Sequence, residues 1–232
     1  MAPSPAGTLI ALAALAAFLA RQPLVLAISD RRRGHRYART VTAERAFALL
    51  ALIAAASLAG AVALGRGRLL VAVGLAAPLA ALALAFDLSR RSRALAAELS
   101  GAMAIGSTVA AIALSGTWRL APALGLWGVL AARSVSSIAY VRARLRLERG
   151  EPDHRAVVLA TQIAAVLAVT ALAVAHLAPW LSVAAFGVLG LRAALGLSPW
   201  RIPLQTWQLG LTEIGFGALT VAAVIVGIRI EG

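Results

Sequence analysis

Eight long apolar segments, separated by short stretches rich in arginine, constrain this chain more than any other feature. They span residues 6–28, 44–64, 69–88, 97–115, 118–140, 156–177, 180–197 and 205–229. About 20 apolar residues in a helix cross a hydrocarbon core of about 30 Å, and a helix satisfies its own backbone there. The chain, 61% hydrophobic, is therefore predicted to be one domain over residues 1–232, an all-α polytopic bundle of eight transmembrane helices.

The arginines between these segments predict the orientation of the bundle. All 22 basic residues are arginine, and sixteen of them fall in alternate connections, at 29–45, 87–97, 141–155 and 192–204. Four fall in the other connections and the C-terminal tail. Because arginine accumulates in short cytoplasmic loops, we expect the sixteen-arginine side to face the cytoplasm, in the inner (cytoplasmic) membrane, with both termini outside. Topology thus accounts for the net charge of +13, and the expected partners are membrane lipids, not nucleic acid.

Residue types that commonly carry catalysis or hold metals are sparse. The chain has no cysteine, and its three histidines, His35, His154 and His176, are scattered. No serine has a base that the sequence would fix beside it. We therefore predict no catalytic residue, no metal site and no cofactor.

Charged residues in the apolar segments are the best candidates for function, since each costs about 2.5–3.5 kcal/mol on insertion scales. Glu213 is the deepest acid, and it either locks helices together as a buried ion pair or serves a ligand. Glu98 opens a helix, where an acid suits the helix dipole, and it could also pair with Arg133 or Arg21. Arg21 lies beside Pro23, which should kink or end the first helix.

One stripe of polar residues runs along the fifth segment. Arg133, Ser137, Tyr140 and Arg144 follow one another at steps of four, three and four residues. This spacing keeps them on one face of a helix. The stripe could line a cavity open to the cytoplasm; alternatively, Arg133 extends its side chain to the membrane surface.

A dense cationic strip closes the same segment. It consists of Arg142, Arg144, Arg146 and Arg149 in "SIAYVRARLRLERG", residues 137–150. One interpretation is a topology anchor that also touches anionic lipid head groups, at about 1 kcal/mol per arginine. The other is an anion-binding opening in which guanidinium groups hold phosphate directly, without metal. The anchor is favoured, because insertion places arginines in short cytoplasmic loops in any case.

Four stretches resemble the YwiC-like bacterial membrane proteins. They are "FLARQPL" (18–24), "ELSGAMA" (98–104), "SSIAYVRARLRLERG" (136–150) and "GLTE" (210–213), of which the "YVRARLR" portion is the most specific. The resemblance covers most of the chain. Members of this family usually open with a further helix carrying a Pro-Lys-Glu-His-Gly-Ala-Trp-like motif, which residues 1–20 do not match. We expect either a divergent short form or a start codon chosen too late, and restoring that helix would make nine spans.

Nine helices in that orientation are also similar to the UbiA-type intramembrane prenyltransferases, so the fold is expected to be UbiA-like with the first helix missing. That likeness implies magnesium-binding acidic motifs in the stretches 29–45 and 141–155. Asp30 fits the leading acid of the first motif, but Arg33 and Tyr37 stand at the next two acid positions. Arginines occupy the second motif. A guanidinium group has no lone pair to offer a metal ion and stays positively charged, whereas magnesium needs oxygen ligands. Magnesium-dependent prenyl transfer is therefore disfavoured.

The leading hypothesis is a YwiC-like integral membrane protein, without catalysis, that binds a lipid-like or anionic ligand in a cavity facing the cytoplasm. An isoprenoid-like molecule is one such ligand. The candidate lining residues are Arg133, Tyr140, Arg144, Glu98 and Glu213. One alternative is a divergent UbiA-like prenyl or lipid-phosphate transferase. The other is a small transporter in which Glu213 couples protons or cations.

Overall fold

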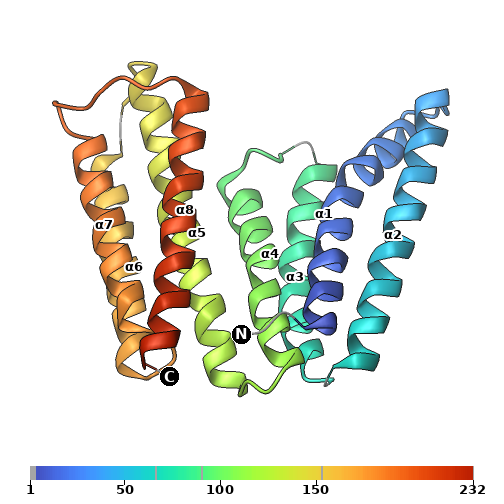
Figure 1. The fold of residues 1–232 in the computed structure, drawn as a ribbon. Helices are drawn as coiled ribbons and strands as arrows, with labels where there is room; N and C mark the ends of the chain where they lie inside the picture. Colours follow the sequence, from blue (N-terminus) through green and yellow to red (C-terminus); the bar gives the residue numbers. More distant parts are fainter. Residues whose placement is uncertain (1–3, 66, 90, 153, 232) are drawn as a thin grey trace. The chain divides into compact units, whose positions relative to one another are not determined.

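The computed structural model describes residues 4–65, 67–89, 91–152 and 154–231. In these residues it contains eight helices and no strand (Figure 1). In chain order they are α1 (Pro5–Arg32), α2 (Ala38–Leu64), α3 (Leu69–Leu88), α4 (Leu95–Ser115), α5 (Leu120–Glu148), α6 (Arg155–Val174), α7 (Trp180–Gly196) and α8 (Thr206–Glu231). The predicted all-α fold with eight helices is confirmed.

Seven of the helices in the described residues, all but α7, are long and apolar enough to cross a membrane. The shortest of these seven have 20 residues, which makes a helix about 30 Å long. Helix α7 is apolar but has only 17 residues, at the lower limit of about 17–25 residues for a spanning helix. The chain is therefore a multi-pass membrane protein. The membrane and the side that its loops face stay predictions.

The helices extend further into the arginine-rich stretches than the sequence predicts. Helix α1 ends at Arg32, α2 begins at Ala38 and α5 continues to Glu148, so the expected connections at 29–45 and 141–155 are mostly helical. Arginine is a good helix former. A helix that has crossed the hydrocarbon can therefore continue into the head-group region, and an apolar pattern does not reveal where it stops.

The two ends of α1 have local causes. At its start, the Ser4 hydroxyl accepts a hydrogen bond from the Gly7 backbone N–H at 3.0 Å, a typical N-cap. Pro23 lies inside the helix but does not end it. The helix instead changes direction along its length in Figure 1, as a missing backbone donor and the proline ring would cause.

The chain forms two compact units, divided within α5 between residues 127 and 128. The first unit contains α1 to α4 and the beginning of α5. Its core lies where α2 and α4 end and α3 begins, around Ala61, Leu69 and Leu114, all of which are fully buried. In this unit α1 packs against α2, α3 and α4, and α3 packs against α4. The prediction of a single domain stays a prediction.

The second unit contains the rest of α5 with α6, α7 and α8. One apolar cluster includes Val129, Val169 and Phe186, and a second includes Tyr140 and Leu209. Helix α7 packs against both α6 and α8. These contacts hold the polar residues of α5, α7 and α8 at fixed positions inside the unit.

Candidate functional site

The polar stripe of α5 faces α7 and α8 in the second unit. Arg133 contacts Glu213 of α8, Tyr140 lies against Arg192 of α7, and Arg144 binds backbone oxygens at the end of α7. The structure thus brings together four of the five predicted residues. It adds Arg192, which was predicted only as an arginine of the connection 192–204.

Glu213 lies between two arginines. Its Oε1 accepts a hydrogen bond from Arg192 Nη1. Arg133 Nη2 donates to the Glu213 backbone oxygen at 2.9 Å and lies 3.8 Å from its Oε2. The exposed fractions of the three side chains are only 18% for Arg133, 11% for Arg192 and 17% for Glu213. The carboxylate therefore joins α5, α7 and α8 through two charged partners.

Arg192 is held between two aromatic rings. Its guanidinium carbon lies 4.1 Å from the ring centroid of Tyr140 and 4.6 Å from that of Phe216. Stacking of this kind is worth about 0.5–2 kcal/mol, more where water is excluded, and Tyr140 is only 4% exposed. The two rings and the hydrogen bond to Glu213 therefore hold the guanidinium group in place.

Glycines give two of these side chains their space. A Cβ atom at Gly217 would lie 3.1 Å from Arg133 Nη2, and one at Gly196 would collide with the Tyr140 hydroxyl. Gly196 therefore needs a residue without a side chain for the present packing, whereas an alanine at Gly217 would require Arg133 Nη2 to shift by a few tenths of an ångström. Glycine at helix interfaces lets neighbouring elements approach closely, here to admit a polar side chain.

Charge and hydrogen bonding are unbalanced around Glu213. Two guanidinium groups face one carboxylate, which leaves a net charge of about +1 among the three side chains. Arg133 Nε, Arg192 Nε, Arg192 Nη2 and Glu213 Oε2 are buried and have no hydrogen-bond partner among the described residues. Buried polar atoms of native proteins are seldom left unpaired, so these atoms mark a place for further polar atoms.

Arg144 instead holds the backbone through its two terminal nitrogens, while its Nε is buried without a hydrogen-bond partner among the described residues. Its Nη1 donates to Gly196 O, and its Nη2 donates to Ile202 O and lies 2.8 Å from Glu148 Oε1. Only 1% of the residue is exposed. It caps the last carbonyl group of α7, where a positive charge suits the helix dipole, and through Ile202 O it ties α5 to the connection between α7 and α8.

Glu98 lies in the first turn of α4, as expected, but in the first unit. The other four predicted residues belong to the second unit. Arg21 is paired with Asp87 of α3: its Nε and Nη2 donate to the two carboxylate oxygens, the latter at 2.6 Å. Asp87 was not predicted as a site residue, although it lies inside the predicted 69–88 segment, where an acid asks for a partner.

Comparison with protein families assigns a family to the first part of the chain. A model of the YwiC-like protein family matches residues 1–114. This part is YwiC-like. Searches of curated proteins and of solved structures gave no match. The YwiC-like region ends within α4. It contains "FLARQPL" and "ELSGAMA" but not the two later stretches that resemble the family. The family match therefore covers less of the chain than the expected resemblance did.

The YwiC-like region also contains Asp30, the residue compared with a magnesium-binding acid. Its two oxygens accept hydrogen bonds from Arg39 Nε at 3.0 Å and Arg39 Nη2 at 2.8 Å, and Oδ2 also accepts from the Thr40 hydroxyl at 2.9 Å. Asp30 is 1% exposed. Its carboxylate therefore joins the end of α1 to the start of α2. In the described part of the chain, no group of three or more histidine, aspartate or glutamate side chains could hold a metal.

Proposed function

We propose that this YwiC-like membrane protein binds an anionic, lipid-like ligand beside Arg133, Tyr140, Arg192 and Glu213 of the second unit, named here the Arg192 site. The observation that carries the proposal is the unpartnered edge of Arg192. Its Nη1 is engaged by Glu213, while Nε and Nη2 are buried without a hydrogen-bond partner in the described residues.

That edge is the one that binds carboxylates elsewhere in this chain. Arg21 and Arg39 each use Nε and Nη2 together, for Asp87 and Asp30 respectively. Two parallel N–H bonds to one anion are the strongest arrangement available to a guanidinium group. A phosphate or carboxylate oxygen pair at Arg192 would complete the same geometry and balance the excess charge beside Glu213.

The position of the site supports a ligand that comes from the membrane surface. Arg192 lies one turn before the end of α7 at Gly196, and Glu213 lies about two turns after the start of α8 at Thr206. Both helix ends adjoin an arginine-bearing connection. On the positive-inside rule this end faces the cytoplasm. A ligand with a phosphate head and a hydrocarbon tail fits both the charge of the site and its apolar surroundings.

The test is a binding titration of purified protein in mild detergent with a prenyl monophosphate. We expect saturable binding to wild-type protein and a rise in melting temperature. Arg192→Lys keeps the charge but loses the paired N–H bonds, so affinity should fall about 10–100-fold, as for a lost charged hydrogen bond of about 1.5–3 kcal/mol. The matched control is Arg146→Lys, at an exposed arginine (42% exposed), which should bind as wild type does.

Two further measurements make the result decisive. The corresponding prenyl alcohol, which lacks the phosphate, should bind much more weakly, because the paired N–H bonds require an anion. Circular dichroism and the melting temperature without ligand show whether Arg192→Lys is folded. Equal affinity of wild type and folded Arg192→Lys, or no saturable binding to wild type, would refute the proposal.

The enzyme and transporter hypotheses remain as alternatives. Because the Asp30 carboxylate is already bound by Arg39 and Thr40, metal binding there would first have to break three hydrogen bonds. This favours binding over prenyl transfer. For transport, flux in proteoliposomes that survives Glu213→Gln would exclude coupling at that residue.

A further inference from the structure

The first unit contains a separate apolar groove. Two adjoining cavities of about 280 Å³ and 320 Å³ lie among α1, α2, α3 and α4. The two cavities form one continuous groove, because they share five lining residues. The shared residues are Ala14, Ala17, Ala80, Ala104 and Thr108. Each cavity is close to the lower end of the usual range for ligand pockets, about 300–1,000 Å³.

Alanine creates this groove. Its small side chains on α1, α3 and α4 leave volume between helices that bulkier residues would fill. The cavity of about 320 Å³ has Ser107 and Thr108 as its polar lining residues and no charged one. It approaches the packed core of the unit, since Ile10 and Ala111 belong to both. The side chains that line an unfilled apolar space lack dispersion contacts on that side. An apolar occupant would supply these contacts and is therefore favoured.

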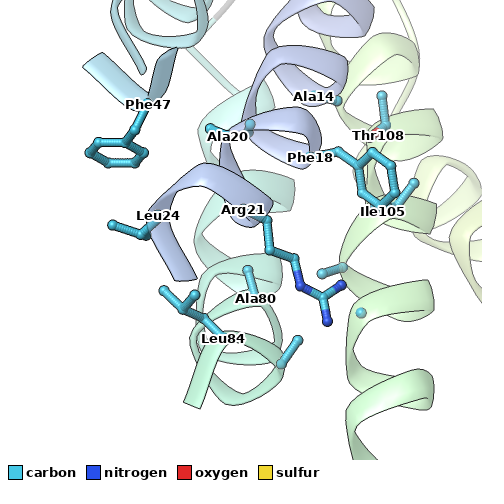
Figure 2. A pocket seen from close by; sticks show the side chains of 14 residues that line it. Ala14, Phe18, Ala20, Arg21, Leu24, Phe47, Ala80, Leu84, Ile105 and Thr108 are labelled. Atoms are coloured by element: carbon cyan, nitrogen blue, oxygen red, sulfur yellow. The ribbon is translucent and has the colours of Figure 1, made fainter. Parts of the chain in front are cut away.

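The other cavity has a single charged residue, Arg21 (Figure 2). Asp87 accepts from its Nε and Nη2, while Nη1 makes no hydrogen bond with the described residues. Gly101 faces this nitrogen, because a Cβ atom there would lie 3.7 Å from Nη1. Arg21 is 30% exposed at its side chain. The groove therefore has no charged residue at one end and offers a hydrogen-bond donor at the other.

We propose that this groove holds one hydrocarbon chain of a membrane lipid, with an oxygen of the head group accepting a hydrogen bond from Arg21 Nη1. The polar end lies toward the ends of α1 and α3, which are adjacent because Arg32 donates to Leu88 O at 3.3 Å. A lipid in that orientation keeps its head group at the arginine-rich surface. A helix, about 10–12 Å across, is too wide for cavities of this volume, whereas a single chain of methylene groups fits.

The proposal does not rest on the Arg192 site, and the experiment keeps the two apart. Protein in mild detergent is photolabelled with a lysophosphatidic acid that carries a diazirine in the middle of its acyl chain. Labelled peptides are then identified by mass spectrometry. We expect the label on the groove-lining faces of α1 and α4, and competition by unlabelled lysophosphatidic acid.

Filling the groove should abolish this labelling. Ala80→Leu combined with Ala104→Leu places a larger side chain in both cavities, and labelling of α1 and α4 should fall about tenfold, since no space is left for the chain. Ala81→Leu is the matched control, because Ala81 is an exposed alanine of the same helix that lines neither cavity. It should label as wild type does.

The head-group contact has its own comparison. An alkane of the same length with the same diazirine should label the groove several-fold less than the lipid, because it gives Arg21 no acceptor. Equal labelling of the filled variant and wild type, or labelling spread evenly over all helices, would overturn the proposal. So would cross-linking of the groove to a second copy of the chain. Arg192→Lys should leave groove labelling unchanged, so the two sites can fail separately.

Discussion

Replacing Arg144 by alanine should destabilise the second unit substantially. The side chain donates to Gly196 O and Ile202 O and pairs with Glu148 at 2.8 Å. Hydrogen bonds to a charged group are worth about 1.5–3 kcal/mol each. Water can reach part of this group after the substitution, since Ile202 is exposed and the Glu148 side chain is 23% exposed. We therefore expect a loss of about 3 kcal/mol in the free energy of unfolding, toward the lower end of the 3–5 kcal/mol for breaking a buried pair.

The measurement is reversible unfolding in mixed micelles by titration with sodium dodecyl sulfate. The five tryptophans of the chain report the transition by fluorescence. Arg146→Ala is the matched control two residues away, because its guanidinium is 42% exposed and 3.9 Å from Glu151, a surface pair worth about 0–1 kcal/mol. If the two variants unfold with free energies within about 1 kcal/mol of each other, Arg144 does not hold α5 to the end of α7 and our account of this contact is wrong.

Three further experiments probe other close contacts under the same unfolding assay. Gly196→Ala should cost about 1–3 kcal/mol through collision with Tyr140, as overpacking does, and Tyr140→Phe in the same chain should recover part of that loss; no recovery would contradict this geometry. Gly227→Ala should cost a similar amount, because its Cβ would lie 2.5 Å from the ring of the proline that precedes α7; a neutral effect would show that α8 shifts freely. A double-mutant cycle of Arg21→Ala and Asp87→Ala should give a coupling of about 1–3 kcal/mol for this paired contact, and additive effects would exclude it.

The number and approximate positions of the helices could be predicted because hydrocarbon imposes a length. The segment predicted at 69–88 is α3 to the residue. The prediction was wrong where α1, α2 and α5 continue into arginine-rich stretches. In these stretches the apolar pattern stops, but the backbone can still form helical hydrogen bonds. The end of the helix therefore lies beyond the end of the apolar segment.

The candidate site was predictable only along single helices. The spacing of Arg133, Tyr140 and Arg144 puts them on one face of α5, and the structure places all three toward α7 or α8. Arg192 was missed because it was counted with the loops, although it lies inside the predicted 180–197 segment. Partners on different helices, such as Glu213 for Arg192, depend on which faces meet, and a single sequence carries no signal for that.

The strip from Arg142 to Arg149 shows why residue type alone does not assign a role. Within it, Arg144 is buried at 2% side-chain exposure, whereas Arg146 and Arg149 are exposed at 42% and 66%. Successive helical residues are turned by about 100°, so arginines two apart point in different directions. Arg144 therefore packs in the interior of the second unit. Arg146 and Arg149 face outward, where they can contact anionic lipid head groups. The strip is thus divided between two environments, and its binding properties have to be tested arginine by arginine.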